Sequence, residues 1–120
     1  MKENNLIKDK AFAFSLMIIG LYQNLVKANE FILSKQLLRS GTSIGANVEE
    51  ATAAQTKRDF ITKMSIASKE ARETKYWLRL LNESKLSGEI LSIHLKEIDD
   101  IINIITAIVK RLKQIYIINS

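Results

Sequence analysis

The stretch from Gln36 to Ala51 combines helical spacing with many small residues. Its apolar residues recur every three or four positions, as on one face of a helix. Among them lie Ser40, Gly41, Thr42, Ser43, Gly45 and Ala46. Each glycine costs a helix about 1 kcal/mol relative to alanine. Close approach of a neighbouring helix is the simplest way to offset that cost, so the stretch predicts a tightly packed helix.

The composition favours an all-α fold in a single domain. The chain has 120 residues, four glycines and no proline, which leaves little turn chemistry for a β-rich fold. The spacing of apolar residues predicts four helices joined by short loops, at about residues 6–27, 31–55, 57–81 and 88–115. We expect an antiparallel up-down four-helix bundle over residues 1–120.

Polar residues in the loops indicate where the helices begin and end. Asn29 is a candidate cap between the first two helices. Thr56 followed by Asp59 resembles a capping box, so the third helix should begin at Lys57. Ser87 is expected to cap the fourth helix, with Glu89 in its first turn.

The two outer helices have more apolar width than one bundle would bury. Beside the main stripe of the first helix lies a second line, formed by Phe12, Leu16 and Ile19. The last helix is broadened by five isoleucines, Ile90, Ile101, Ile104, Ile108 and Ile115. Exposed apolar bands are a liability on a monomer. We therefore expect self-association, to which the glycine-rich second helix would contribute.

Several classes of site are excluded or disfavoured by residue content. The absence of cysteine excludes disulfides, thiolate zinc sites and cysteine nucleophiles. The only histidine occurs as His94-x-x-Glu97, the reverse of the Glu-x-x-His order that di-iron bundles use twice. No nucleophile-elbow motif is present. We expect a non-enzymatic protein with no catalytic residue, metal site or cofactor.

The apolar run from Ala11 to Leu21 resembles the core of a secretory signal. Glu3 and Asp9 lie in the segment that a signal peptide would keep positive, and the helical spacing continues beyond the run. The run is also shorter than the ~20 apolar residues of a membrane span. We therefore expect a cytoplasmic protein with no membrane partner.

Positive charge is concentrated in the third predicted helix. The chain has a formal net charge of +5, and residues 57–81 contain seven basic and three acidic residues. Helical spacing places five residues on one stripe, with Lys75 flanking it and Lys63 further off: Arg58, Lys69, Arg72, Tyr76 and Arg79. Regularly spaced cations can contact successive phosphates of a nucleic-acid backbone, and a tyrosine among them can stack on one base. The alternative is a solvated helix face partly paired with nearby acids.

A second set of polar residues is expected to have structural roles. Glu70 and Glu73 lie beside Ile66 and Trp77, which suggests partial burial, and Arg39 is a candidate partner for both. A paired-carboxylate site is the weaker alternative. The structural set comprises Arg39, Asn47, Glu50, Glu70 and Glu73, and Asn47 resembles the polar core residues that set helix register.

Three segments of the chain resemble the 23S ribosomal RNA intervening-sequence proteins, also called the S23 family. They are residues 43–51 (SIGANVEEA), 59–67 (DFITKMSIA) and 69–78 (KEARETKYWL). The resemblance implies a four-helix bundle that assembles into a ring of five. It also implies kinship with the basic pentameric accessory proteins of diversity-generating retroelements, which engage nucleic acid and a polymerase. It brings no catalytic residue.

These observations lead to two functional hypotheses. The favoured one is a homo-oligomeric, pentameric bundle that binds nucleic acid, RNA before DNA, through the basic face of the third helix. The alternative is a structural adaptor that recruits a protein such as a reverse transcriptase without binding nucleic acid itself.

Overall fold

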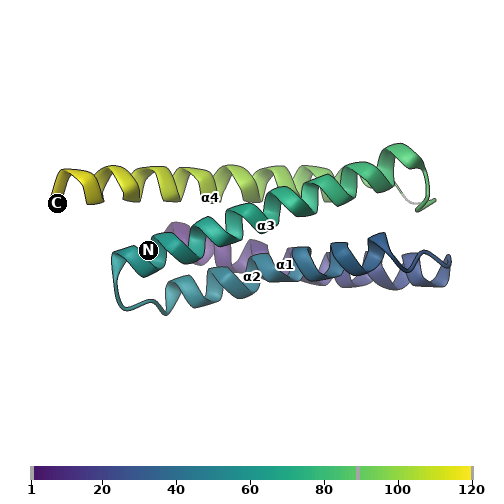
Figure 1. Cartoon of the computed structure of the whole chain (residues 1–120), viewed down its shortest axis with the longest axis horizontal. Helices are drawn as coiled ribbons and strands as arrows, with labels where there is room; N and C mark the ends of the chain where they lie inside the picture. Colours follow the sequence, from purple (N-terminus) through teal and green to yellow (C-terminus); the bar gives the residue numbers. More distant parts are fainter. Residues whose placement is uncertain (1, 89, 120) are drawn as a thin grey trace.

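Four long helices make up the fold of the computed structural model, which describes residues 2–88 and 90–119, and the side chains of residues 2–88 and 90–115. They are α1 (Lys2–Lys27), α2 (Leu33–Thr52), α3 (Lys57–Ser84) and α4 (Ser92–Asn119). The helices run alternately up and down in a bundle of 52 × 22 × 22 Å (Figure 1). Each helix packs on two neighbours: α1 and α3 both contact α2 and α4. No strand occurs in the described ranges. The sequence therefore predicted the all-α class and the four helices correctly.

The α1–α2 turn is held by Asn29 and Glu30. Asn29 adopts a left-handed conformation with φ 66°. Its N–H donates to the Val26 carbonyl at 3.0 Å, and the Glu30 N–H donates to the Leu25 carbonyl at 2.9 Å. This pair of hydrogen bonds is a Schellman motif, which ends α1.

Glu30 also begins α2. Its carboxylate accepts hydrogen bonds from the backbone N–H groups of Leu33 at 2.9 Å and Ser34 at 2.7 Å. Burial alone would raise the pKa of this carboxyl, but the backbone hydrogen bonds outweigh it and lower the pKa from its ordinary value. The helix therefore begins two residues later than expected from spacing.

The start of α3 was predicted correctly, whereas neighbouring boundaries differ from the expectation. Thr56 caps α3, because its side chain accepts a hydrogen bond from the Asp59 N–H at 3.0 Å. The preceding helix ends at Thr52 instead of Gln55, since Ala53 and Ala54 donate to carbonyls three residues back in a tighter turn.

The third helix continues to Ser84, three residues beyond the expected end, and Lys85 terminates it with φ 60°. The prediction that Ser87 caps α4 was wrong, because α4 begins at Ser92. Ser87 is instead a buried residue of the connecting turn. The expected place of Glu89 in a first helical turn lies outside the described residues.

The space beside the two glycines of α2 is filled by atoms of α1 in the same chain. A Cβ added at Gly41 would lie 2.9 Å from Cγ2 of Ile18 on α1. A Cβ at Gly45 would lie 3.5 Å from the Ala11 carbonyl oxygen. Close helix approach is confirmed, but the partner is α1 of the same subunit. The expectation that these glycines contribute to self-association was therefore wrong.

The apolar excess of α4 is mostly buried in the bundle. Ile101 and Ile108 are buried, and Ile104 is partly buried against the core. The core that buries them also contains residues of α1 and α3, and both of these helices contact α4. The expectation that the last helix exposes a broad isoleucine band was therefore wrong at Ile101, Ile104 and Ile108. Ile115 is half-buried, and Ile90, which is 83% exposed, precedes the first residue of α4.

The second apolar line of α1 does face outward. Phe12, Leu16 and Ile19 are 64%, 57% and 38% exposed, while the main stripe of α1 is buried. One α1 face thus remains apolar and uncovered in the single subunit. None of the helices, over the described part of the chain, is long and apolar enough to cross a membrane.

Candidate nucleic-acid interface

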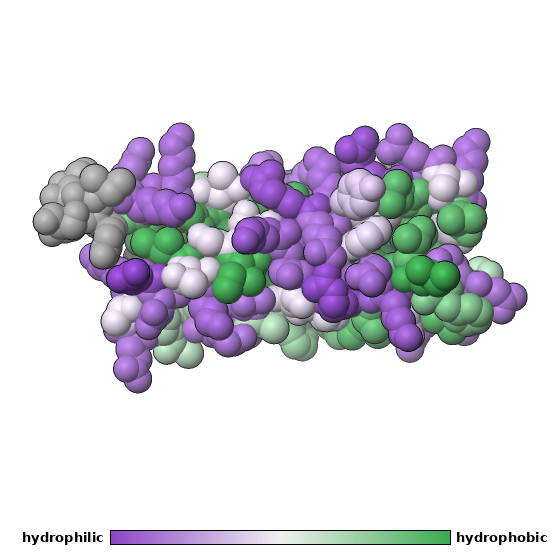
Figure 2. Space-filling model, viewed as in Figure 1, coloured by the Kyte–Doolittle hydropathy of each residue, from purple (hydrophilic) through white to green (hydrophobic). Residues whose placement is uncertain are grey.

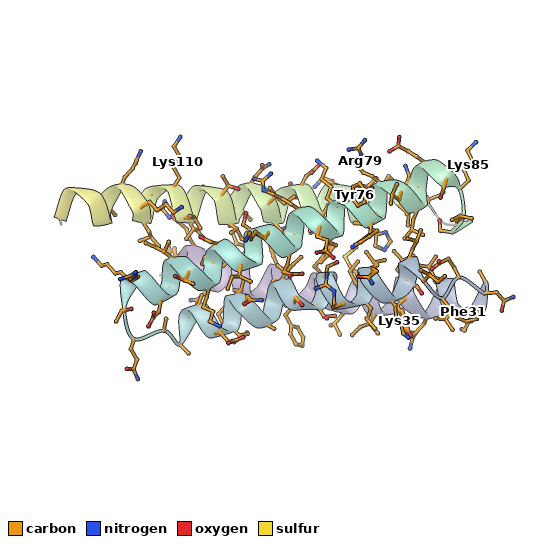
Figure 3. The ribbon with its side chains drawn as sticks, viewed as in Figure 1. Phe31, Lys35, Tyr76, Arg79, Lys85 and Lys110 are labelled. Carbon is orange, nitrogen blue, oxygen red and sulfur yellow. The ribbon has the colours of Figure 1, made fainter. Side chains whose placement is uncertain are left out.

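The basic residues predicted from the sequence lie mainly on the outer face of α3. Arg58, Lys69, Arg72 and Arg79 are exposed. These residues lie on the opposite side of α3 from its core positions, which include Met64, Ala67, Ala71 and Leu78. Tyr76 lies on this face too and is 54% exposed. In Figure 3, the labelled Tyr76, Arg79 and Lys110 lie on the same side of the bundle.

Three of the predicted cations have an acidic neighbour. Lys63 Nζ lies 3.0 Å from Glu50 on α2, and Lys75 Nζ lies 2.7 Å from Asp99 on α4. Arg79 pairs with Glu83 one turn further along α3, at 3.4 Å. The solvated, partly paired face that was the alternative interpretation therefore describes these three residues.

The remaining three predicted cations have no such partner. Arg58 and Lys69 form no ion pair with a described residue. Arg72 Nη2 instead donates to Thr106 Oγ1 on α4 at 3.4 Å, a neutral acceptor. Their charges are therefore not neutralised within the described chain and are available to an anion.

A basic groove lies between α3 and α4. One hollow of about 360 Å³ is lined by residues of both helices: Ser65, Ser68, Arg72, Thr106, Val109, Lys110 and Lys113. A second hollow of about 430 Å³ is lined by Arg58, Ile61, Thr62 and Lys113. Lys113 lines both hollows, so they follow one boundary between the helices. We refer to these lining residues as the α3–α4 groove.

The groove contains two cations that were not assigned to the site from the sequence. Lys110 and Lys113 lie near the end of α4 and therefore do not belong to the basic stripe predicted for α3. They lie about one turn apart on α4 and form no ion pair with a described residue. Their spacing was visible in the sequence, but their position opposite Arg58 and Arg72 depends on how α4 packs on α3.

Tyr76 is held in place by the aromatic residue that follows it. The ring centroids of Tyr76 and Trp77 are 5.3 Å apart, with an edge-to-face angle of 68°. Trp77 in turn donates a hydrogen bond from Nε1 to Glu73 at 2.9 Å. The tyrosine ring is thus both exposed and supported from one side, as a stacking platform requires.

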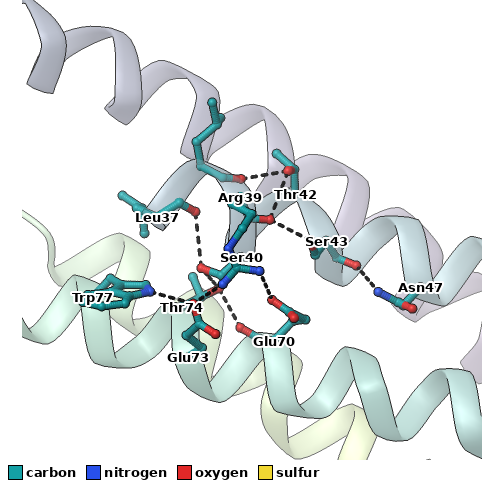
Figure 4. A network of polar contacts seen from close by, with 11 residues as sticks. Leu37, Arg39, Ser40, Thr42, Ser43, Asn47, Glu70, Glu73, Thr74 and Trp77 are labelled. Carbon is teal, nitrogen blue, oxygen red and sulfur yellow. Dashed lines mark hydrogen bonds and ion pairs between the residues drawn. The ribbon is translucent and has the colours of Figure 1, made fainter. Parts of the chain in front are cut away.

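Three of the five predicted structural polar residues, Arg39, Glu70 and Glu73, form a network between α2 and α3 (Figure 4). Arg39 on α2 donates to Glu70 at 3.2 Å and also pairs with Glu73. The Trp77 hydrogen bond and then the Arg39 pairing lower the pKa of Glu73, against the effect of burial. The hydrogen bond to Glu73 is likewise the main cause that raises the pKa of Arg39. This arrangement supports a structural role for the carboxylates.

A buried hydroxyl pair below this network was not recognised from the sequence. Thr74 Oγ1 lies 2.9 Å from Ser40 Oγ, and both residues are fully buried. Asn47 donates to the Ser43 carbonyl of its own helix at 2.9 Å, so this amide bond does not link two helices. Glu50 links α2 to α3 through Lys63. In the described residues, no group of three or more His, Cys, Asp and Glu side chains is placed to hold a metal ion.

The four-helix fold is that of a class of proteins named for ribosomal RNA intervening sequences, as comparisons with known proteins show. The family model for 23S rRNA-intervening sequence proteins matches residues 3–111. The chain belongs to this family. The resemblance of the three segments in α2 and α3 is therefore confirmed.

A solved relative from Bacteroides thetaiotaomicron has the same fold. It is a protein of unknown function from the S23 ribosomal protein family, 43% identical to this chain. The match covers 90% of this chain and 98% of the relative, with a TM-score of 0.84. No curated protein matches. Neither the family description nor the solved relative names an enzymatic activity.

Proposed function

We propose that this chain is a non-enzymatic, cytoplasmic, self-associating bundle that binds nucleic acid through the basic face of α3, with RNA favoured over DNA. The observation that carries the proposal is the set of unpaired charges at Arg58, Lys69 and Arg72. Cations that neutralise phosphates release counterions, which drives binding without requiring any base contact. The net charge of +5 acts in the same direction.

Self-association is the second part of the proposal, as a ring of five by resemblance to the family. The exposed line of Phe12, Leu16 and Ile19 supports it, because an apolar helix face is stabilised by contact with another copy. Repetition of the basic face in one assembly would make weak single contacts add up through avidity.

Light scattering at low micromolar concentration measures the oligomeric state. We expect a multimer for the natural chain and a lower mass for the Phe12→Lys/Leu16→Lys variant. A natural chain that scatters as a 13.6 kDa monomer would contradict self-association.

Filter binding across a salt series tests nucleic-acid binding directly. The Arg58→Glu/Arg72→Glu variant should lose affinity for RNA at every salt concentration while its oligomeric state is retained. Lys27→Glu/Lys35→Glu is the matched control, because both lysines are exposed and Lys35 lies on the opposite side of the bundle from Lys110 (Figure 3). Equal losses in the two variants would contradict a role for α3.

A second candidate function is a protein adaptor that recruits a polymerase such as a reverse transcriptase. Hydrophobic residues reach the surface at the end of the bundle that carries the α1–α2 and α3–α4 turns, as Figure 2 shows. The exposed side chains there include Phe31, Ile32, Leu86, Ile90 and Ile93. No affinity of the natural chain for RNA or DNA, even at low salt, would favour the adaptor over nucleic-acid binding.

A further inference from the structure

The side chains that line the α3–α4 groove are of the kinds that bind phosphate. Two cations from α3 and two from α4 line it: Arg58, Arg72, Lys110 and Lys113. Four hydroxyl residues lie between them: Thr62, Ser65, Ser68 and Thr106. Arginine, lysine and hydroxyl side chains are common donors to phosphate oxygens. Among the described residues, no carboxylate lines either hollow.

We propose that the α3–α4 groove binds the backbone of a single-stranded nucleic acid. This inference rests on the proposed function and specifies its site and its substrate class. It places the main contacts at the boundary with α4, and not on the outermost face of α3. Lys69 and Arg79, which belong to the predicted stripe, line neither hollow of the groove.

The dimensions of the groove favour one strand over a duplex. Two packed helices have axes about 8–10 Å apart, so the hollow between them is too narrow to enclose a double helix. From Arg58 to Arg72 the groove follows about 21 Å of α3. This length matches roughly six phosphates of a stacked strand, at about 3.4 Å each.

Tyr76 provides a stacking position just beyond the groove. It lies one helical turn after Arg72 on the same exposed side of α3, and its ring packs against Trp77. A strand leaving the groove at Arg72 therefore meets an exposed aromatic ring. Binding of single strands commonly combines a cationic groove with such a ring, on which a base of any type stacks.

Fluorescence anisotropy with labelled oligonucleotides tests the inference. The probes are single-stranded oligouridylate and oligothymidylate of about 12 nucleotides and a mixed-sequence duplex of the same length. The groove variant is Lys110→Gln/Lys113→Gln. The matched variant is Lys27→Gln/Lys35→Gln, which loses the same charge at two exposed lysines outside the groove. A third variant, Lys69→Gln/Arg79→Gln, removes two stripe cations of α3 that line neither hollow. Circular dichroism and light scattering verify the fold and assembly of each variant.

We expect the groove variant to bind both single strands at least about 10-fold more weakly. The slope of log K (the association constant) against log salt should become less steep by about 1.4, which corresponds to two lost phosphate contacts at ~0.7 each. The matched variant should lose less than about threefold at 0.15 M salt, where charges beyond ~8 Å are screened. Tyr76→Ala should cost about 10-fold and Tyr76→Phe little.

The outcomes separate this inference from the proposed function. Absence of binding by the natural chain to every probe overturns both. Binding by the natural chain that is lost in Lys69→Gln/Arg79→Gln and retained in Lys110→Gln/Lys113→Gln overturns the groove and leaves α3 binding intact. Equal affinity for the duplex and the single strands overturns the assignment to single-stranded nucleic acid.

Discussion

The close approach of α2 to α1 at Gly41 can be measured with a pair of glycine-to-alanine substitutions. A Cβ at Gly41 would lie 2.9 and 3.0 Å from the two γ-carbons of the buried Ile18, whereas carbon atoms normally approach to ~3.5–4.0 Å. At Gly20, an added Cβ meets nothing within 4 Å. Both glycines are inside helices, so alanine improves helix propensity equally at the two positions.

The difference between the two alanine variants therefore isolates the steric cost. Gly20→Ala should raise the free energy of unfolding by about 1 kcal/mol. Gly41→Ala gains the same free energy from helix propensity, but overpacking against Ile18 costs about 1–3 kcal/mol. Because Ile18 is branched at Cβ, which itself lies 3.3 Å from the new atom, it cannot turn the contact away with a distal torsion. The net change at Gly41 is a loss of roughly 0–2 kcal/mol.

Urea denaturation followed by circular dichroism measures both free energies. All variants are compared at one protein concentration, because self-association would make stability depend on concentration. A double-mutant cycle with Ile18→Ala provides the control: in that background Gly41→Ala should no longer be destabilising. A Gly41→Ala chain at least as stable as Gly20→Ala would refute the contact between α1 and α2.

The cap of α3 and the polar contacts between α2 and α3 can be tested by substitution and by acidification. Thr56→Ala removes the side-chain acceptor that caps α3 and should lower the free energy of unfolding by about 1 kcal/mol; an unchanged urea midpoint would show that the cap is dispensable. Thr74→Val keeps the shape of the side chain but deprives Ser40 of its buried partner, which should cost about 1–3 kcal/mol in the same assay, whereas a neutral change would contradict the hydrogen bond. The pKa of Glu73 is held below its ordinary value of 4.5, so its contacts stabilise the fold above that pH and are lost as the pH falls through the lower folded-state pKa. Thermal unfolding of the natural chain and of Glu73→Gln should therefore converge on acidification, and parallel curves down to about pH 2 would contradict this linkage.

Much of the core was predictable from the sequence, because helical spacing directly identifies the face that must be buried. The apolar residues that recur at helical spacing in α1 and α3 lie in the core; they include Phe14, Ile18, Met64 and Leu78. The capping residue Thr56 was also predictable, since a hydroxyl at this position has a local partner three residues away. Such features depend on neighbours within one or two turns.

The basic site was only partly predictable. Spacing placed Arg58, Lys69 and Arg72 on an outward stripe of α3, and the structure exposes them. Spacing could not show that Lys75 meets Asp99 of α4, which neutralises one of the predicted cations. An ion pair between helices depends on how far each helix is rotated about its own axis.

Four amphipathic helices, the faces they bury and an excess of positive charge on the third all follow from the order of residues along the chain. The burial of Ile101 and Ile108, and the position of Lys110 and Lys113 beside Arg58 and Arg72, depend instead on how α4 packs against its neighbours. The two kinds of feature differ because the periodicity of a sequence defines directions around one helix axis only. Which directions of two helices meet is decided by the packing of the whole bundle, where contacts such as that of Gly41 with Ile18 set the distances between helices.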